Sequence, residues 1–97
     1  MGDAVAFPFA ARTANLQIVT GRGELIGWSI WESAGSPAAA QVRFHNGTTT
    51  GEPLLGGAKF AASGTDAGPN YDEGIRFTVG LFMEIVAGNV EGVIFIR

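Results

Sequence analysis

The chain has no cysteine, and only 15% of its 97 residues are charged. The missing cysteine excludes a disulfide scaffold, a cysteine-ligated zinc or iron–sulfur site and a cysteine nucleophile. The charged fraction is well below the roughly 25% of an ordinary soluble domain. Because a domain this small has a large surface for its core, some of that surface must be apolar, and we expect it to form an oligomer interface.

Long apolar runs and basic tracts are also missing. No apolar stretch approaches the roughly 18–20 residues that a membrane span needs, and Asp3 with no early Lys or Arg disfavours a signal peptide. The six basic residues are dispersed among nine acidic ones, for a formal net charge of −3. Because binding to phosphates needs a basic stripe, this balance disfavours nucleic acid. We expect a protein made in the cytoplasm, with neither nucleic acid nor membrane as a partner.

Glycine and residues suited to β-strands are abundant. The chain has 15 glycines, about twice the usual share, and its apolar residues alternate with polar ones at the period of a strand. Alternating or apolar segments of strand length cover residues 16–20, 24–33, 39–45, 52–60, 75–79, 81–86 and 93–96. About seven or eight short strands with no helical periodicity predict an all-β fold, a two-sheet antiparallel β-sandwich of jelly-roll type. Residues 16–97 are expected to form this single domain.

Alternation also predicts which side chains form the core. In the segment 24–33, Ile26, Trp28 and Ile30 share one face, which leaves Trp31 pointing outward. An outward tryptophan is typical of an interface. The full predicted core is Ile26, Trp28, Ile30, Val42, Phe44, Ile75, Phe77, Leu81, Met83 and Ile85.

Residues 1–15 form an N-terminal segment with Phe7, Pro8 and Phe9 at its centre. Pro8 excludes a central strand, because proline cannot donate to the sheet ladder. Two alternatives remain open: an edge strand, or an arm whose Phe7 and Phe9 dock on a neighbouring subunit.

The last third of the chain predicts further subunit contacts. Phe82 and Val86 alternate out of phase with the core residues of their strand, and the closing segment 93–96 is apolar on both faces. A strand apolar on both faces must be covered on both, by the second sheet on one side and by another subunit on the other. The predicted interface residues are Trp31, Phe82, Val86, Ile94 and Ile96.

Candidate catalytic residues are few, and we expect no enzyme and no cofactor. His45 is the only histidine and is expected on the solvent side of its strand, beside the Asn46–Gly47 turn. Glu24 and Glu32 are eight residues apart on one strand, which separates them by about 26 Å. Glycoside hydrolysis needs two carboxylates roughly 5–10 Å apart, so this pair is excluded.

One acidic cluster has the ligand chemistry of a calcium site. Asp66, Asn70, Asp72 and Glu73 surround Gly68–Pro69, and hard oxygen ligands in a loop suit Ca²⁺. Their spacing does not match the EF-hand pattern, so the cluster is interpreted as a solvated acidic loop and no metal site is predicted.

Four stretches carry a resemblance to a known group of proteins. They read GELIGWSIW from residue 23, AQVRFHNGT from 40, GIRFTVGLFMEIVAG from 74 and VEGVIFI from 90. Together they resemble small bacteriophage virion proteins, which are β-sandwich modules used for capsid decoration, head-fibre bases and tail components. The resemblance spans about the last three quarters of the chain and is best over residues 74–96.

The resemblance implies a non-enzymatic structural protein of the virion, often a symmetric trimer. Its implied partners are further copies of itself and the major capsid protein or another virion protein, whose surface it would stabilise. A tail-tip or tail-fibre module is an alternative within this class. A carbohydrate-binding domain is an alternative from another class, because sugar rings stack on exposed aromatic side chains such as Trp31.

Overall fold

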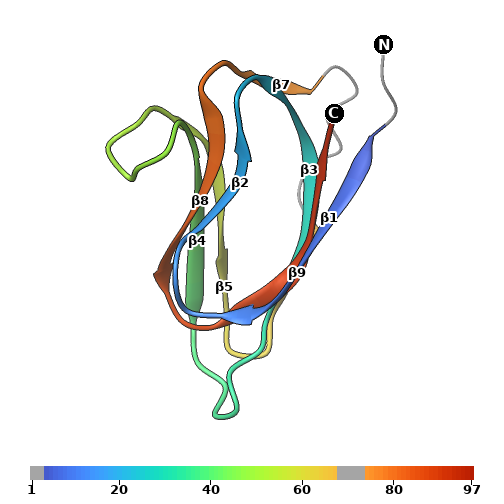
Figure 1. The fold of residues 1–97 in the computed structure, drawn as a ribbon. Helices are drawn as coiled ribbons and strands as arrows, with labels where there is room; N and C mark the ends of the chain where they lie inside the picture. Colours follow the sequence, from blue (N-terminus) through green and yellow to red (C-terminus); the bar gives the residue numbers. More distant parts are fainter. Residues whose placement is uncertain (1–3, 68–73) are drawn as a thin grey trace.

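The computed structural model describes residues 4–67 and 74–97, which form two antiparallel sheets packed face to face (Figure 1). The strands are β1 (Val5–Arg12), β2 (Leu16–Thr20), β3 (Gly23–Glu32), β4 (Ala40–Asn46), β5 (Leu54–Phe60), β6 (Thr65–Ala67), β7 (Ile75–Phe77), β8 (Gly80–Ala87) and β9 (Val90–Ile96). The predicted all-β sandwich is confirmed. None of the described residues belongs to a helix long and apolar enough to cross a membrane.

The two sheets differ in their strand order. Sheet A has the order β1-β9-β3, and both β6 and β7 pair with the remaining edge of β3. Sheet B has the order β2-β8-β4-β5. The short β6 lies outside the strand segments that the sequence predicts. It forms because Thr65, Asp66 and Ala67 pair with the end of β3.

The core lies between the sheets and consists of the side chains that alternate inward. Nine of the predicted core residues are buried, and eight of these belong to the core cluster. Ile26 is buried but is not part of that cluster, and Ile75 is half-buried and packs against it. Trp28 of sheet A packs against Phe44 of sheet B with ring centroids 4.8 Å apart. Its indole Nε1–H donates to Asp66 Oδ2 at 2.8 Å, which satisfies the one polar atom of this buried ring.

The strand β3 departs from simple alternation at one point. Simple alternation with Ile26, Trp28 and Ile30 would place Leu25 on the outer face, but it is fully buried in the core. The pairing of β3 with β9 shifts between Leu25 and Gly27, so Ile26 is an extra residue in the ladder. Such a bulge reverses the inward–outward phase on its two sides, which is why Leu25 and Trp28 both face the core.

Of the two alternatives for the N-terminal segment, the structure shows the edge strand. β1 pairs with β9 of the same chain from Val5↔Ile96 to Phe9↔Gly92. Phe9 is 9% exposed and belongs to the core, and Phe7 packs against that core. The two phenylalanines therefore dock on their own sandwich rather than on a neighbouring subunit, and residues 5–12 are part of the domain rather than a separate arm.

Candidate functional site

The structure does not bring the five predicted interface residues together. Trp31 lies on the outer side of sheet A, whereas Phe82 and Val86 lie on the outer side of sheet B. Ile94 is 0% exposed because it faces the core from the centre of sheet A, so it cannot contact a subunit. Ile96 also packs against the core. The prediction of a subunit contact is therefore wrong for Ile94.

The outward residues of β9 are the ones that the sequence reasoning missed. Phe95 is 37% exposed, and Val93 is half-buried. The charged residues Glu91 and Arg97 share the parity of Val93 and Phe95 along the strand. This parity was the available signal, since charged positions mark the face of a strand that water reaches.

Strand pairing brings a set of weakly charged residues together on the outer side of sheet A. Ala6, Phe95 and Gly27 are neighbours across the strands, as are Pro8, Val93 and Ser29. The next row joins Glu91, Trp31 and Thr65. These nine residues define what we call the sheet A face, and Glu91 is the only one among them that carries a charge: Ala6, Pro8, Gly27, Ser29, Trp31, Thr65, Glu91, Val93 and Phe95.

The size of the sheet A face decides what contact it can support. Three residues in each of three rows, with neighbouring strands about 4.8 Å apart and rows about 6.6 Å apart, cover roughly 290 Å². Apolar patches of about this size occur on ordinary monomeric proteins, and many of these patches are functional. A specific interface buries about 800 Å² on each partner. The sheet A face therefore supplies about a third of a standard interface, and repeated copies would have to add the remainder.

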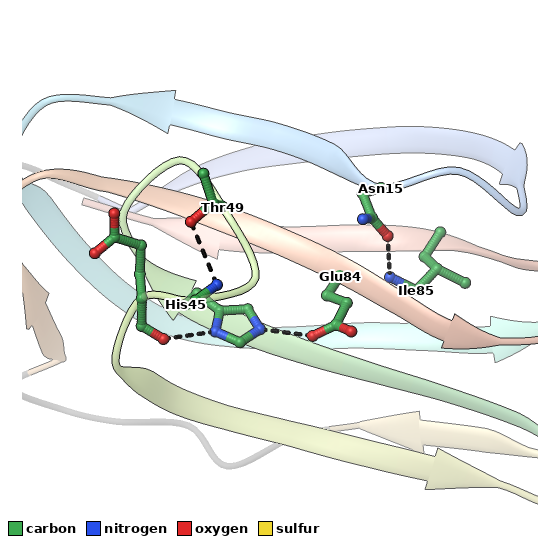
Figure 2. Close-up of polar contacts among 7 residues, drawn as sticks. Asn15, His45, Thr49, Glu84 and Ile85 are labelled. Atoms are coloured by element: carbon green, nitrogen blue, oxygen red, sulfur yellow. Dashed lines mark hydrogen bonds and ion pairs between the residues drawn. The ribbon is translucent and has the colours of Figure 1, made fainter.

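His45 was expected on the solvent side of its strand, and this prediction is wrong. Its side chain is buried, with 2% exposure. The connection between β4 and β5 folds back over its ring, and the Glu52 carbonyl oxygen lies 2.9 Å from Nδ1 (Figure 2). On the other side of the ring, Glu84 Oε1 lies 2.8 Å from Nε2. The Phe82 ring is 6.4 Å away between centroids. Sequence alone could not show this cover, because it depends on the path of the connection.

The two partners of His45 restrict its chemistry. A backbone carbonyl accepts hydrogen bonds only, and so does an ionised carboxylate. The Glu52 carbonyl oxygen thus accepts from Nδ1–H, and Glu84 Oε1 engages Nε2. Because the ring is buried and the protein occupies both of its nitrogens, the geometry gives His45 a structural environment.

Glu32 also has a structural environment. Its carboxylate accepts hydrogen bonds from the backbone N–H groups of Ala34 at 2.6 Å and Ser63 at 2.7 Å. These bonds, that from Ser63 first, hold the pKa of Glu32 below its ordinary value. Glu24 lies near the opposite end of β3, so the two carboxylates do not meet.

A hollow at the end of sheet A gathers basic side chains that are dispersed in the sequence. Among the described residues, it is lined by Arg22, Gly23, Glu24, Arg76, Thr78 and Arg97 and has a volume of about 660 Å³. Figure 1 shows why they meet: the turn before β3, the strand β7 and the end of β9 lie at the same end of the sandwich. We call this the arginine hollow.

Glu24 lies at the centre of the arginine hollow. It is directly opposite Arg76 on β7, and its Oε1 accepts a hydrogen bond from Arg97 Nε at 2.9 Å. The hydrogen bond from Arg97, with the positive charges of Arg97 and Arg76, lowers the pKa of Glu24. Among the described residues that line the hollow, three guanidinium groups meet one carboxylate, in a chain that is negative as a whole.

The acidic cluster proposed from the sequence is only partly described. Asp66 accepts the hydrogen bond from Trp28 and so supports the core. Asn70, Asp72 and Glu73 lie outside the described residues. Within residues 4–67 and 74–97, no group of three or more histidine, aspartate or glutamate side chains is placed to hold a metal ion.

Comparisons with family models, with curated proteins and with solved structures found no match to this chain. The surfaces described above, together with the sequence resemblance, are therefore the basis for a functional inference.

Proposed function

We propose that this chain is a non-enzymatic structural protein that self-associates through the sheet A face and serves on the surface of a bacteriophage virion. The observation that supports self-association is the composition of the sheet A face. On this face Trp31, Val93 and Phe95 are grouped together, and Glu91 is the one charged residue beside them. The virion setting is supported by the resemblance of residues 23–48 and 74–96 to phage β-sandwich modules. There the chain would bind the major capsid protein or another virion protein.

The limited area of the sheet A face fits a protein that works in many copies. About 290 Å² of weakly charged surface gives a modest contact on its own. On a lattice, each copy is held near the next, and the effective concentration turns modest contacts into stable attachment. A symmetric trimer is the assembly that the resemblance implies.

The mass of the purified chain in solution tests the self-association. We expect light scattering to give a multiple of the 10.1 kDa chain mass. Phe95→Lys, which places a charge on the sheet A face, should shift the protein toward the monomer. Leu54→Lys is the matched control, because Leu54 is an exposed apolar residue of β5 in the other sheet. A wild-type protein that stays monomeric at high concentration contradicts the proposal.

The virion setting has its own test. Virus particles released from a culture of the source organism would be purified by density and analysed by mass spectrometry. Peptides of this chain in the particles support the proposal, and separated heads and tails distinguish a capsid protein from a tail-tip or tail-fibre module. Their absence from particles with a complete set of structural proteins contradicts it.

Trp31 supports a second candidate function, carbohydrate binding. Its indole is 36% exposed on an open sheet surface, with Thr65 and Glu91 as polar neighbours in the same row. Sugars bind to such combinations of an aromatic ring with hydrogen-bonding groups. Binding to a glycan array that is lost in Trp31→Ala would favour this function, and an array without binding would exclude it for the glycans displayed.

A further inference from the structure

We propose that the arginine hollow is a binding site for an acidic segment of a partner protein, which it recognises through the carboxylates of that segment. Three of the six basic residues of the chain line this one hollow. No sequence tract brings them together, so the fold creates the site. The proposal goes beyond self-association, because it needs no second copy of this chain.

The base of the hollow is held in place by the sheet. Glu24 and Arg97 are joined by two backbone hydrogen bonds, Glu24 N–H to Arg97 O at 2.8 Å and Arg97 N–H to Glu24 O at 2.9 Å. The side-chain bond of 2.9 Å between them adds a third link. Arg76 faces Glu24 from the strand on the other side. A site whose groups are already placed loses less entropy on binding than one that must be assembled.

Within residues 4–67 and 74–97, two guanidinium groups of the hollow are available to a ligand. Among the described residues, the ion pair of the hollow joins Arg97 to Glu24, and the exposed side chains of Arg22 and Arg76 take no part in it. Each guanidinium offers five N–H donors in a planar fork that matches a carboxylate. The hydroxyl of Thr78 is a further donor at the same rim.

The shape and lining of the hollow indicate the kind of ligand. Its volume of about 660 Å³ corresponds to roughly twenty water molecules, which is far more than one carboxylate or phosphate group occupies. Its described lining has no aromatic or aliphatic side chain on which a nucleobase or a lipid chain would pack. A long polyanion such as nucleic acid would meet the negative charge of the remaining surface. An extended segment with several carboxylates fits these conditions.

The position of the hollow relates it to the proposed assembly. Arg97 follows Phe95 by two residues and has the same parity on β9, so the hollow lies at one end of the sheet A face. A partner protein bound at the hollow would therefore lie beside an assembly formed through that face.

Calorimetric titration of the full chain tests the site, with hexaglutamate as the probe at low ionic strength. We expect Arg22→Ala and Arg76→Ala each to weaken binding about three- to tenfold, in line with the loss of a charged hydrogen-bonded contact. Glu24→Gln should strengthen it, because the competing carboxylate is removed. Arg43→Ala is the matched control, since Arg43 is an exposed arginine of β4 in sheet B.

Several outcomes would overturn the proposal. One is a wild-type protein that does not bind hexaglutamate, and another is an Arg43→Ala variant that loses as much affinity as the hollow variants. Inorganic phosphate that binds as tightly as hexaglutamate would show a site for a single oxyanion instead of an acidic segment. Binding should also weaken steeply with salt, because the contacts are exposed charge pairs.

The same samples separate this proposal from the proposed function. The hollow variants should keep the oligomer mass of the wild type, whereas Phe95→Lys should lose mass and keep its affinity for hexaglutamate. Urea denaturation of each variant confirms that it is folded. The two substituted arginines are exposed, so the midpoint should stay close to that of the wild type.

Discussion

Glu32 ties two loops to the end of β3 with one carboxylate. It accepts hydrogen bonds from Ala34 N–H in the connection to β4 and from Ser63 N–H in the connection between β5 and β6. Backbone bonds to an ionised acceptor are stronger than those to a neutral one. A buried acid, which composition alone marks as a surface residue, thus holds loops from two parts of the chain.

This arrangement predicts a loss of stability in acid. The pKa of Glu32 in the folded protein is below the ordinary value of 4.5, so its contribution is present above that value and is lost as the pH falls through the lowered pKa. We expect the unfolding free energy to fall below about pH 4.5, and to fall less in Glu32→Gln. Urea denaturation at neutral pH and at pH 3 measures the difference.

Two comparisons make this test specific. Glu91→Gln removes a carboxylate from the sheet A face and should leave the acid loss as it is in the wild type. Glu24 contributes in the same pH range, since its pKa is also lowered. A Glu32→Gln variant with the full acid loss of the wild type would assign the whole effect to other groups.

Among the elements, β9 is the strand on which sheet A depends, because it pairs with β1 on one side and β3 on the other. Gly92 permits the close approach of β9 to β3. A Cβ at this position would overlap the Ser29 carbonyl oxygen and would lie 2.8 Å from Ile30 Cα. A glycine inside an apolar strand often marks such a backbone contact.

We therefore expect Gly92→Ala to destabilise the protein by roughly 3 kcal/mol or more, as overpacking against backbone does. The clash is with main-chain atoms that cannot turn aside. Gly35→Ala is the control, because a Cβ there meets nothing within 4 Å. Denaturation midpoints of the two variants give the comparison, and equal midpoints would contradict the proposed contact.

The edge strands show how the sandwich limits uncontrolled pairing. β1 is an edge strand with a largely apolar sequence, which is a hazard for aggregation. Pro8 lies at its centre and pairs with Val93. Because proline has no N–H, it removes one of the hydrogen bonds that another chain would need for edge pairing, which favours contacts through the sheet A face instead.

For the whole molecule, the sheet A face and the outer side of sheet B differ in charge. The sheet A face has Glu91 as its one charged residue and adjoins the arginine hollow at one end, whereas the outer side of sheet B carries Arg43, Lys59 and Glu84. The weakly charged sheet A face suits contacts with other copies, and the charged side of sheet B suits water.

Trp31→Ala tests this division at the scale of the assembly. Trp31 is exposed on the sheet A face and pairs across the strands with Glu91 and Thr65. Its removal should leave the fold intact and lower the oligomer mass, since exposed aromatic residues carry much of the energy of an interface. Sedimentation velocity measures the mass, and circular dichroism confirms the strands.

An unchanged oligomer mass in Trp31→Ala would contradict this prediction, because it would place the subunit contact elsewhere on the molecule. Phe77→Ala is the contrast, because Phe77 is buried in the core, and its removal should cost roughly 3–5 kcal/mol of stability and reduce folding itself.

The sequence by itself determined the all-β class, most strand positions and eight of the fifteen buried residues of the described core, because alternation within one strand reports which side chains face the sheet interior. Trp28, Phe44 and Met83 were predicted from that pattern alone and are buried. Only the tertiary structure decided the bulge that turns Leu25 inward, the burial of His45 and of Ile94, and the meeting of Arg22, Arg76 and Arg97 in one hollow. These features depend on register and on which strands become neighbours. Such long-range pairings are not contained in any local pattern of the chain.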